Sequence, residues 1–230
     1  MSERRLAAIL SLDVVGYSRM MQTTSGLLLS TLNFLYRDLV TPIVKAHKGR
    51  VVKLLGDGAI VEFRSVARAL EAAIAVQRAL REPDNPYQKP QRIMLRAGLH
   101  VGDVVADGDD IFGDGVNIAV RLQSAAEPGG VLVSRMVSDL IGAEFSNQLQ
   151  GEGLRTFKGI TQPIEVLSVD FLDETEAQAR KDFEAAQKVQ YYRTDDGVNL
   201  AWSVVGGGSP VVKALGGGRR STRDDEEPGQ

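Results

Sequence analysis

The feature that most constrains the fold is an almost unbroken apolar run over residues 6–15, which contains a single acid, Asp13. A strand with one solvent-facing side alternates apolar and polar residues, whereas a strand covered on both faces reads as a continuous apolar run. We therefore expect Leu6 to Val15 to form a central strand. The charge of Asp13 near the end of this strand then needs a reason.

The rest of the pattern is typical of an α+β protein. Apolar residues recur at helical spacing over 26–47, and two β-rich runs, 50–55 and 59–63, flank Gly56-Asp57-Gly58, where Asp-Gly supplies the positive φ of a tight hairpin turn. We expect further elements in this order: helix 66–80, strand 93–105, turn 107–110, helix 116–126, strand 131–134 and a hairpin of 154–158 with 164–169. This order predicts a ferredoxin-like α+β sandwich over about residues 6–170, with helices covering one face of a mainly antiparallel sheet.

The chain divides into three parts by composition. Residues 1–170 carry the expected sandwich domain, and the charged, alanine-rich residues 171–189 are expected to form a linker helix. Residues 190–230 begin as a hairpin and then lose all pattern. The stretch 216–230 has almost nothing to bury, so we expect it to be disordered.

Charge and composition exclude several classes of function. The chain has 27 Lys and Arg against 30 Asp and Glu, a net charge of -3, and so lacks the basic field that nucleic-acid binding uses. Cysteine is absent, so a catalytic metal would need oxygen ligands. The apolar stretch 6–12 is too short for a signal or membrane helix, and we expect a cytoplasmic protein with no membrane segment.

Two acids, Asp13 and Asp57, indicate a function only when they are considered together. Alone, Asp13 would cap the helix that follows a strand, and Asp57 would be an ordinary hairpin residue. If the two strands are neighbours, the carboxylates meet at one end of the sheet, where a divalent cation would relieve their repulsion. Two carboxylates with phosphate oxygens hold hard metals in phosphoryl-transfer sites.

Two further pairs carry polar chemistry. Asn117 and Arg121 are four residues apart in an expected helix, so they share a face and could hold a ribose oxygen and a developing phosphate charge. A lysine that donates and an aspartate that accepts, such as Lys53 and Asp110, would select adenine, because guanine presents the opposite pattern at the same ring edges. His100 is expected to be a packed strand residue because no second histidine partners it.

These motifs, in this order, resemble the class III adenylyl cyclase catalytic domain of the bacterial soluble type over residues 4–169. The resemblance implies that Asp13 and Asp57 bind two divalent metal ions, Mg²⁺ or Mn²⁺, with the backbone carbonyl of Val14 as an added ligand. It implies that Lys53 and Asp110 recognise adenine and that Asn117 and Arg121 stabilise the transition state. Triphosphate contacts are implied for four residues: Gly16, Tyr17, Ser18 and Lys158.

The resemblance also implies a partner and a reaction. ATP would become 3′,5′-cyclic AMP and pyrophosphate in a homodimer, with the metal aspartates from one chain and the base and transition-state residues from the other. The alternatives are a guanylyl cyclase, which Lys53 and Asp110 disfavour, and an inactive regulatory dimerisation module, which the complete motif set disfavours. Residues from 190 resemble the start of an α/β-hydrolase domain, but they end before any nucleophile turn.

Overall fold

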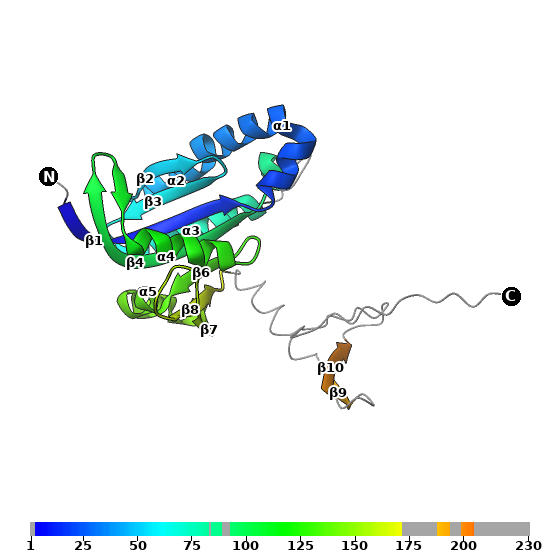
Figure 1. The fold of residues 1–230 in the computed structure, drawn as a ribbon. Helices are drawn as coiled ribbons and strands as arrows, with labels where there is room; N and C mark the ends of the chain where they lie inside the picture. Colours follow the sequence, from blue (N-terminus) through cyan, green and yellow to red (C-terminus); the bar gives the residue numbers. More distant parts are fainter. Residues whose placement is uncertain (1–2, 83, 89–92, 172–187, 194–198, 205–230) are drawn as a thin grey trace. The chain divides into compact units, whose positions relative to one another are not determined.

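A computed structural model of the chain describes residues 3–82, 84–88, 93–171, 188–193 and 199–204 (Figure 1). The chain divides into two units, Met1–Phe171 and Leu172–Gln230. The first unit contains an eight-stranded sheet with strand order β2-β3-β1-β4-β6-β8-β7, and β5 pairs with β4 beside this path. The β4–β6 pair is parallel and every other pair is antiparallel, so the unit is the α+β sandwich expected from the sequence.

The strands run as follows: β1 Glu3–Val14, β2 Arg50–Leu55, β3 Gly58–Phe63, β4 Leu95–Asp107, β5 Asp110–Phe112, β6 Val131–Ser134, β7 Leu149–Arg155 and β8 Ile164–Val169. The helices are α1 Tyr17–Phe34, α2 Thr41–Ala46, α3 Val66–Arg81, α4 Asp114–Ala125 and α5 Arg135–Leu140. A π-helical segment, Leu35–Val40, joins α1 to α2, and short 3₁₀ turns lie at Pro86–Gln88 and Ala143–Gln148.

The central strand β1 is buried on both faces, as its continuous apolar run predicts. Its residues Ala8, Leu10, Leu12 and Val14 face the main core, which α1, α2, α3 and α5 cover. On the opposite face, Ala7 and Ile9 pack in a smaller cluster with Ala119 of α4. The expectation that helices cover one face is therefore wrong for α4, which lies on the other face of the sheet, in front of β4 in Figure 1.

Helix α4 approaches the sheet closely because glycines line its contact with β4. A Cβ on Gly98 would lie 2.2 Å from the Gln123 backbone nitrogen, and one on Gly102 would lie 2.9 Å from the Cα of Gly115 in α4. Only residues without a side chain leave room for such a contact. These glycines set the depth of α4 on the sheet, and with it the position of every side chain that α4 carries.

The second unit is described only at its hairpin, where β9 (Lys188–Arg193) pairs antiparallel with β10 (Asn199–Val204). Residues 188 and 189 belong to β9 and not to the linker helix expected over 171–189; the rest of that helix from 172, like the expected disordered tail 216–230, lies outside the described residues. None of the described helices combines the length and the apolar character needed to cross a bilayer.

Candidate active site

The acids Asp13 and Asp57 come together at one end of the sheet. Asp13 is the penultimate residue of β1 and lies opposite Gly58 of β3, and Asp57 occupies the turn just before Gly58. The Val14 amide donates a hydrogen bond to the Asp57 carbonyl oxygen over 3.1 Å, and the Tyr36 hydroxyl donates to the same oxygen over 2.8 Å. The turn that carries Asp57 is thus tied to the end of β1.

The surroundings of Asp13, including the neighbouring Asp57, change its protonation. Burial, and next the charge and side-chain hydrogen bond of the neighbouring Asp57, together raise the pKa of Asp13 to about 6. Arg96 and Gln123 act in the opposite direction. Without a cation, Asp13 therefore keeps its proton over part of the acidic range in which a free aspartate is ionised.

This arrangement fits a divalent cation. Carboxylate oxygens are the ligands that Mg²⁺ and Mn²⁺ prefer, and a cation would supply the positive charge that the proton provides in its absence. Within the described part of the chain, no cluster of three or more His, Cys, Asp or Glu side chains has a metal-binding arrangement. Two carboxylates leave coordination positions for further oxygen ligands, an arrangement that phosphoryl-transfer sites use.

The chain turns into α1 directly after Asp13 and Val14. Gly16, the residue before the helix, has a φ of 71°, a left-handed conformation that favours glycine. A Cβ at this position would meet no atom within 4 Å, so the space above the turn is open. Tyr17 and Ser18 are the first helical residues, and their amides belong to the helix terminus that attracts anions.

Lys53 and Asp110 form an ion pair. The Lys53 Nζ lies 2.7 Å and 2.8 Å from the two carboxylate oxygens of Asp110, and this hydrogen bond is the main reason why the pKa of Asp110 is lowered. A bulge between Val51 and Lys53 shifts the register of β2, so that Lys53 lies opposite Ile60 on the α4 face of the sheet. The aromatic ring of Phe112 lies below the ammonium, at 5.0 Å.

Asn117 and Arg121 lie on the outer face of α4. Both are exposed, and the residues that face the sheet are Gly115, Ala119, Leu122 and Gln123. In the described part of the chain, neither outer side chain has a hydrogen-bond or ion-pair partner. The structure keeps the pair on one helix face but does not bring it to Asp13 and Asp57 of the same chain.

Lys158 is also apart from the acids. It is exposed in the turn between β7 and β8, and β4, β6 and β8 separate β7 from β1 in the sheet. Within one chain, the structure therefore does not bring Lys158 to Asp13.

Three residues at the site were not found by sequence reasoning. Tyr36 binds the Asp57 carbonyl, and Gln123 of α4 hydrogen-bonds to Asp13. Arg96 lies directly opposite Asp13 on β4, and its buried Nε has no hydrogen-bond partner. The one available signal was a cation inside the apolar segment 93–99, because the role of Arg96 depends on strand register.

Three comparisons place this geometry among known proteins. Residues 2–166 match the family model described as "Adenylate and Guanylate cyclase catalytic domain". A Rhizobium meliloti (strain 1021) protein named "Putative adenylate cyclase 3" is 37% identical over 163 residues, which cover 71% of this chain and 28% of that protein. This chain therefore spans less than a third of the length of that relative.

Solved structures give the same fold. The structure titled "Adenylate/Guanylate Cyclase/Hydrolase from Silicibacter pomeroyi" has a TM-score of 0.67 and 38% identity, and covers 74% of this chain and 99% of its own. The adenylyl cyclase CyaB from P. aeruginosa has a TM-score of 0.65 at 20% identity, over 76% of this chain and 98% of its own. The family match ends at residue 166, and the expected hydrolase-like start after residue 190 is not supported.

Proposed function

Because this chain belongs to the adenylate and guanylate cyclase catalytic domain family, we propose that it converts ATP into 3′,5′-cyclic AMP and pyrophosphate as a homodimer. The observation that carries this proposal is the meeting of Asp13 and Asp57 beside the open N-terminus of α1. The name of the Rhizobium meliloti relative supports the choice of adenylate.

In the proposed reaction, the ribose 3′-oxygen bonds to the α-phosphorus and the bond from that phosphorus to the bridging oxygen breaks. Pyrophosphate leaves, and the proton of the 3′-hydroxyl is lost to solvent. Asp13, Asp57 and the Val14 carbonyl would hold two divalent cations, Mg²⁺ or Mn²⁺, which when bound neutralise the triphosphate and lower the pKa of the 3′-hydroxyl. The amides of residues 16–18 would bind phosphate oxygens.

Arg96 also suits the triphosphate. Its guanidinium lies beside Asp13, and its buried Nε donor has no partner in the described structure. Since a buried donor without a partner is costly, a bound phosphate oxygen would satisfy it. We assign Arg96 to orienting the phosphate chain next to the acids.

Lys53 and Asp110 would read the base. In the chain without nucleotide each neutralises the other, and their ion pair holds both polar groups in one place. The Lys53 ammonium would donate to a ring nitrogen of adenine, and the Asp110 carboxylate would accept from the exocyclic amine. Guanine offers a carbonyl where Asp110 needs a donor, so two acceptors would face each other.

The position of α4 supports the proposed homodimer. Asn117 and Arg121 are exposed and unpartnered on a helix that does not bring them to the acids of their own chain. A second copy related by a two-fold axis would present its α4 to Asp13 and Asp57, and the reverse contact would form a second, equivalent site. There Arg121 would stabilise charge on the α-phosphate and Asn117 would orient the ribose.

Product analysis tests this function. We expect the purified chain, given Mg²⁺ or Mn²⁺, to form cyclic AMP and pyrophosphate from ATP, and to use GTP at roughly one tenth of that efficiency or less. Preferential formation of cyclic GMP would favour the guanylyl cyclase alternative. Absence of product from both nucleotides, with folded dimers present, would favour the inactive regulatory module.

The variant Asp57→Ala tests the role of the acid pair. We expect it to lower turnover by about 10²-fold or more, because one of the two carboxylates that hold the cations is gone, without loss of the fold. Asp139→Ala is the matched control, since Asp139 is an exposed acid of α5 that pairs with Arg135 in the part of the chain that the structure describes. Equal turnover in the two variants would show that Asp57 does not hold the catalytic cations.

A further inference from the structure

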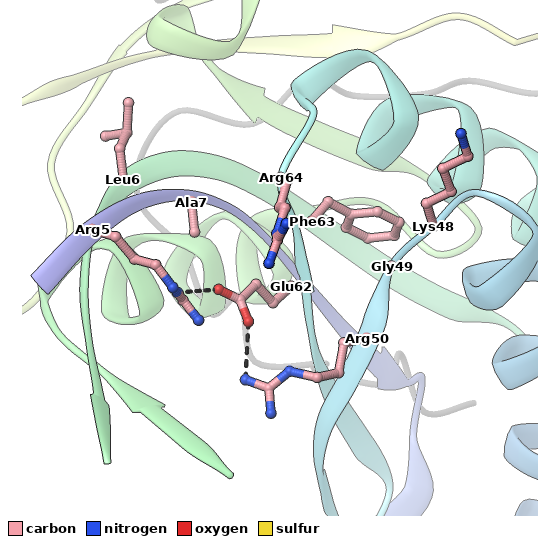
Figure 2. Close-up of a pocket in the computed structure, with 9 residues that line it drawn as sticks. All are labelled: Arg5, Leu6, Ala7, Lys48, Gly49, Arg50, Glu62, Phe63 and Arg64. Carbon is pink, nitrogen blue, oxygen red and sulfur yellow. Dashed lines mark hydrogen bonds and ion pairs between the residues drawn. The ribbon is translucent and has the colours of Figure 1, made fainter. Parts of the chain in front are cut away.

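A polar cavity lies at the opposite end of the β1–β3 pair from the acids. It has a volume of about 580 Å³, and Figure 2 shows the residues that line it. Ala8 lies opposite Phe63 at this end, five pairs before Asp13 and Gly58, which corresponds to roughly 17 Å along the strands. The cavity is therefore separate from the acid pair Asp13 and Asp57.

Its charge is strongly unbalanced. Four cationic side chains line the cavity, Arg5, Lys48, Arg50 and Arg64, against one acid, Glu62. Among the lining side chains, four positive charges and one negative charge leave an excess of three, and the Asp109 carboxylate, outside this lining, lies 4.0 Å from Arg50. The whole chain is acidic, with a net charge of -3, so this concentration of cations does not follow from its composition.

Glu62 fixes two of the guanidinium groups. Its side chain is 10% exposed, and its carboxylate binds Arg5 through one oxygen and Arg50, at 3.0 Å, through the other (Figure 2). A second nitrogen of Arg50 donates to the Asp109 carbonyl oxygen over 2.9 Å, in the turn before Asp110. Arg5 makes a single contact of this kind, so donors of its guanidinium remain available to a ligand.

Arg64 has no such fixed partner. It is exposed, and in the described part of the chain its side chain makes no hydrogen bond or ion pair. Figure 2 shows its guanidinium directed toward the side of the cavity where Glu62 lies. Lys48 lines the far side, in a loop whose Gly49 lies against the ring of Phe63.

We propose that this cavity binds a small molecule through a multiply charged phosphate group. Arginine forks match phosphate oxygens in pairs, and Arg5 and Arg64 offer donors that Glu62 does not occupy. The volume lies within the range of small-molecule sites, roughly 300–1,000 Å³, and a concave shape favours a small ligand. A multiply charged group offsets the excess of three positive charges better than a single carboxylate.

Calorimetry with the full chain tests the proposal. Titrations use pyrophosphate, inorganic phosphate and acetate in the presence of EDTA, so that no cation recruits phosphate to Asp13 and Asp57. We expect pyrophosphate to bind more tightly than inorganic phosphate, and acetate not to bind, because charge selects the ligand. Comparing the affinities for pyrophosphate and for inorganic phosphate also shows whether the cavity prefers two linked phosphates or a single phosphate group. Absence of pyrophosphate binding to the unaltered chain would overturn the proposal.

Variants locate the site. We expect Arg64→Gln to weaken pyrophosphate binding roughly tenfold, which is the effect of losing one charge-assisted hydrogen bond. The control Arg68→Gln removes an exposed arginine that pairs with Glu71 outside the cavity, and should leave binding unchanged. If Arg121→Ala abolishes binding and Arg64→Gln does not, the phosphate occupies the catalytic surface and the proposal is wrong. Binding does not depend on cyclase activity, so it fails or succeeds independently of the proposed function.

Discussion

At the scale of single residues, Asp13 lies where two effects oppose its charge. Burial and the charge of Asp57 raise its pKa from 3.8 to about 6. The native chain therefore binds more protons than the unfolded chain between these values. Deprotonation of Asp13 therefore lowers the free energy of unfolding as pH rises from about 4 to about 6. This loss of stability is complete above pH 6.

We expect Asp13→Asn to stabilise the chain while abolishing cyclase activity. Because the side chain is half-exposed, solvent screening reduces the gain to about 1 kcal/mol at pH 8. Urea unfolding at pH 8 in EDTA measures it, with the exposed Asp139→Asn as the control. An Asp13→Asn chain that unfolds at lower urea than the unaltered chain would show that the carboxylate pair is not under repulsion.

His100 is buried, as the sequence predicts, and illustrates the opposite sign. Its Nδ1 lies 2.7 Å from the Ser134 hydroxyl oxygen, and burial lowers its pKa to about 4. Between about pH 4 and 6.5, the His100 imidazole binds a proton in the unfolded chain, where its pKa is 6.5, but not in the native chain. Stability is thus fully present above pH 6.5 and is lost as pH falls toward 4.

The expected loss is about 3 kcal/mol at pH 4, at roughly 1.4 kcal/mol per pKa unit. We expect His100→Gln to remove this part of the acid dependence, because glutamine does not titrate. Urea unfolding at pH 7.5, 6 and 4.5 for both chains gives the difference. Parallel pH profiles for the two chains would show that the pKa of His100 is the same in the native and the unfolded state.

Site residues were predictable from the sequence where their neighbours along the chain mark them out. The acid in a buried strand and the acid in a Gly-Asp-Gly turn stand out in the sequence, and the structure brings them together. Tyr36, Arg96 and Gln123 were not predictable, because each reaches the site through helix packing or strand register. The open Nε donor of Arg96, in particular, depends on its placement opposite Asp13.

At the scale of elements, the hairpin of β2 and β3 and the strand β6 match their predicted ranges closely. Helix α1 begins at Tyr17 and not at residue 26. The sequence did not predict its first turns because residues 17–25 lack the regular apolar spacing that indicates a helix. The three-residue strand β5 and the six-residue helix α5 were missed, since both are shorter than a sequence pattern needs. The bulge in β2, which directs Lys53 to the α4 face, left no sequence signal.

The contact of α4 with β4 gives a prediction at this scale. We expect Gly98→Ala to destabilise the chain by about 1–3 kcal/mol and to lower kcat, because the new methyl group would meet the α4 backbone and displace Asn117 and Arg121. Gly151→Ala is the control, since a Cβ there would meet no atom within 4 Å. Urea unfolding and steady-state kinetics compare the two. A Gly98→Ala chain with unchanged kcat would show that α4 depth does not set catalysis.

At the scale of the whole molecule, the fold class follows from the order of strands and helices, but the placement of α4 does not. A helix of twelve residues with buried Ala119 and Leu122 packs equally well on either face by its pattern alone. Glycines on β4 determine the face on which α4 packs, because they leave room for it on the face opposite the main core. That placement leaves Asn117 and Arg121 facing outward, which is the observation behind the proposed site shared between two chains.

Complementation between two inactive chains tests the shared site most directly. We expect Asp13→Ala and Arg121→Ala each to be inactive as homodimers, because every site in them lacks one essential group. When the two chains are mixed and exchange partners, one of the two sites in each heterodimer contains all its residues, so activity should return to roughly a quarter of that of the unaltered protein. Heterodimers shown by differential tagging that produce no cyclic AMP from ATP would contradict the shared site.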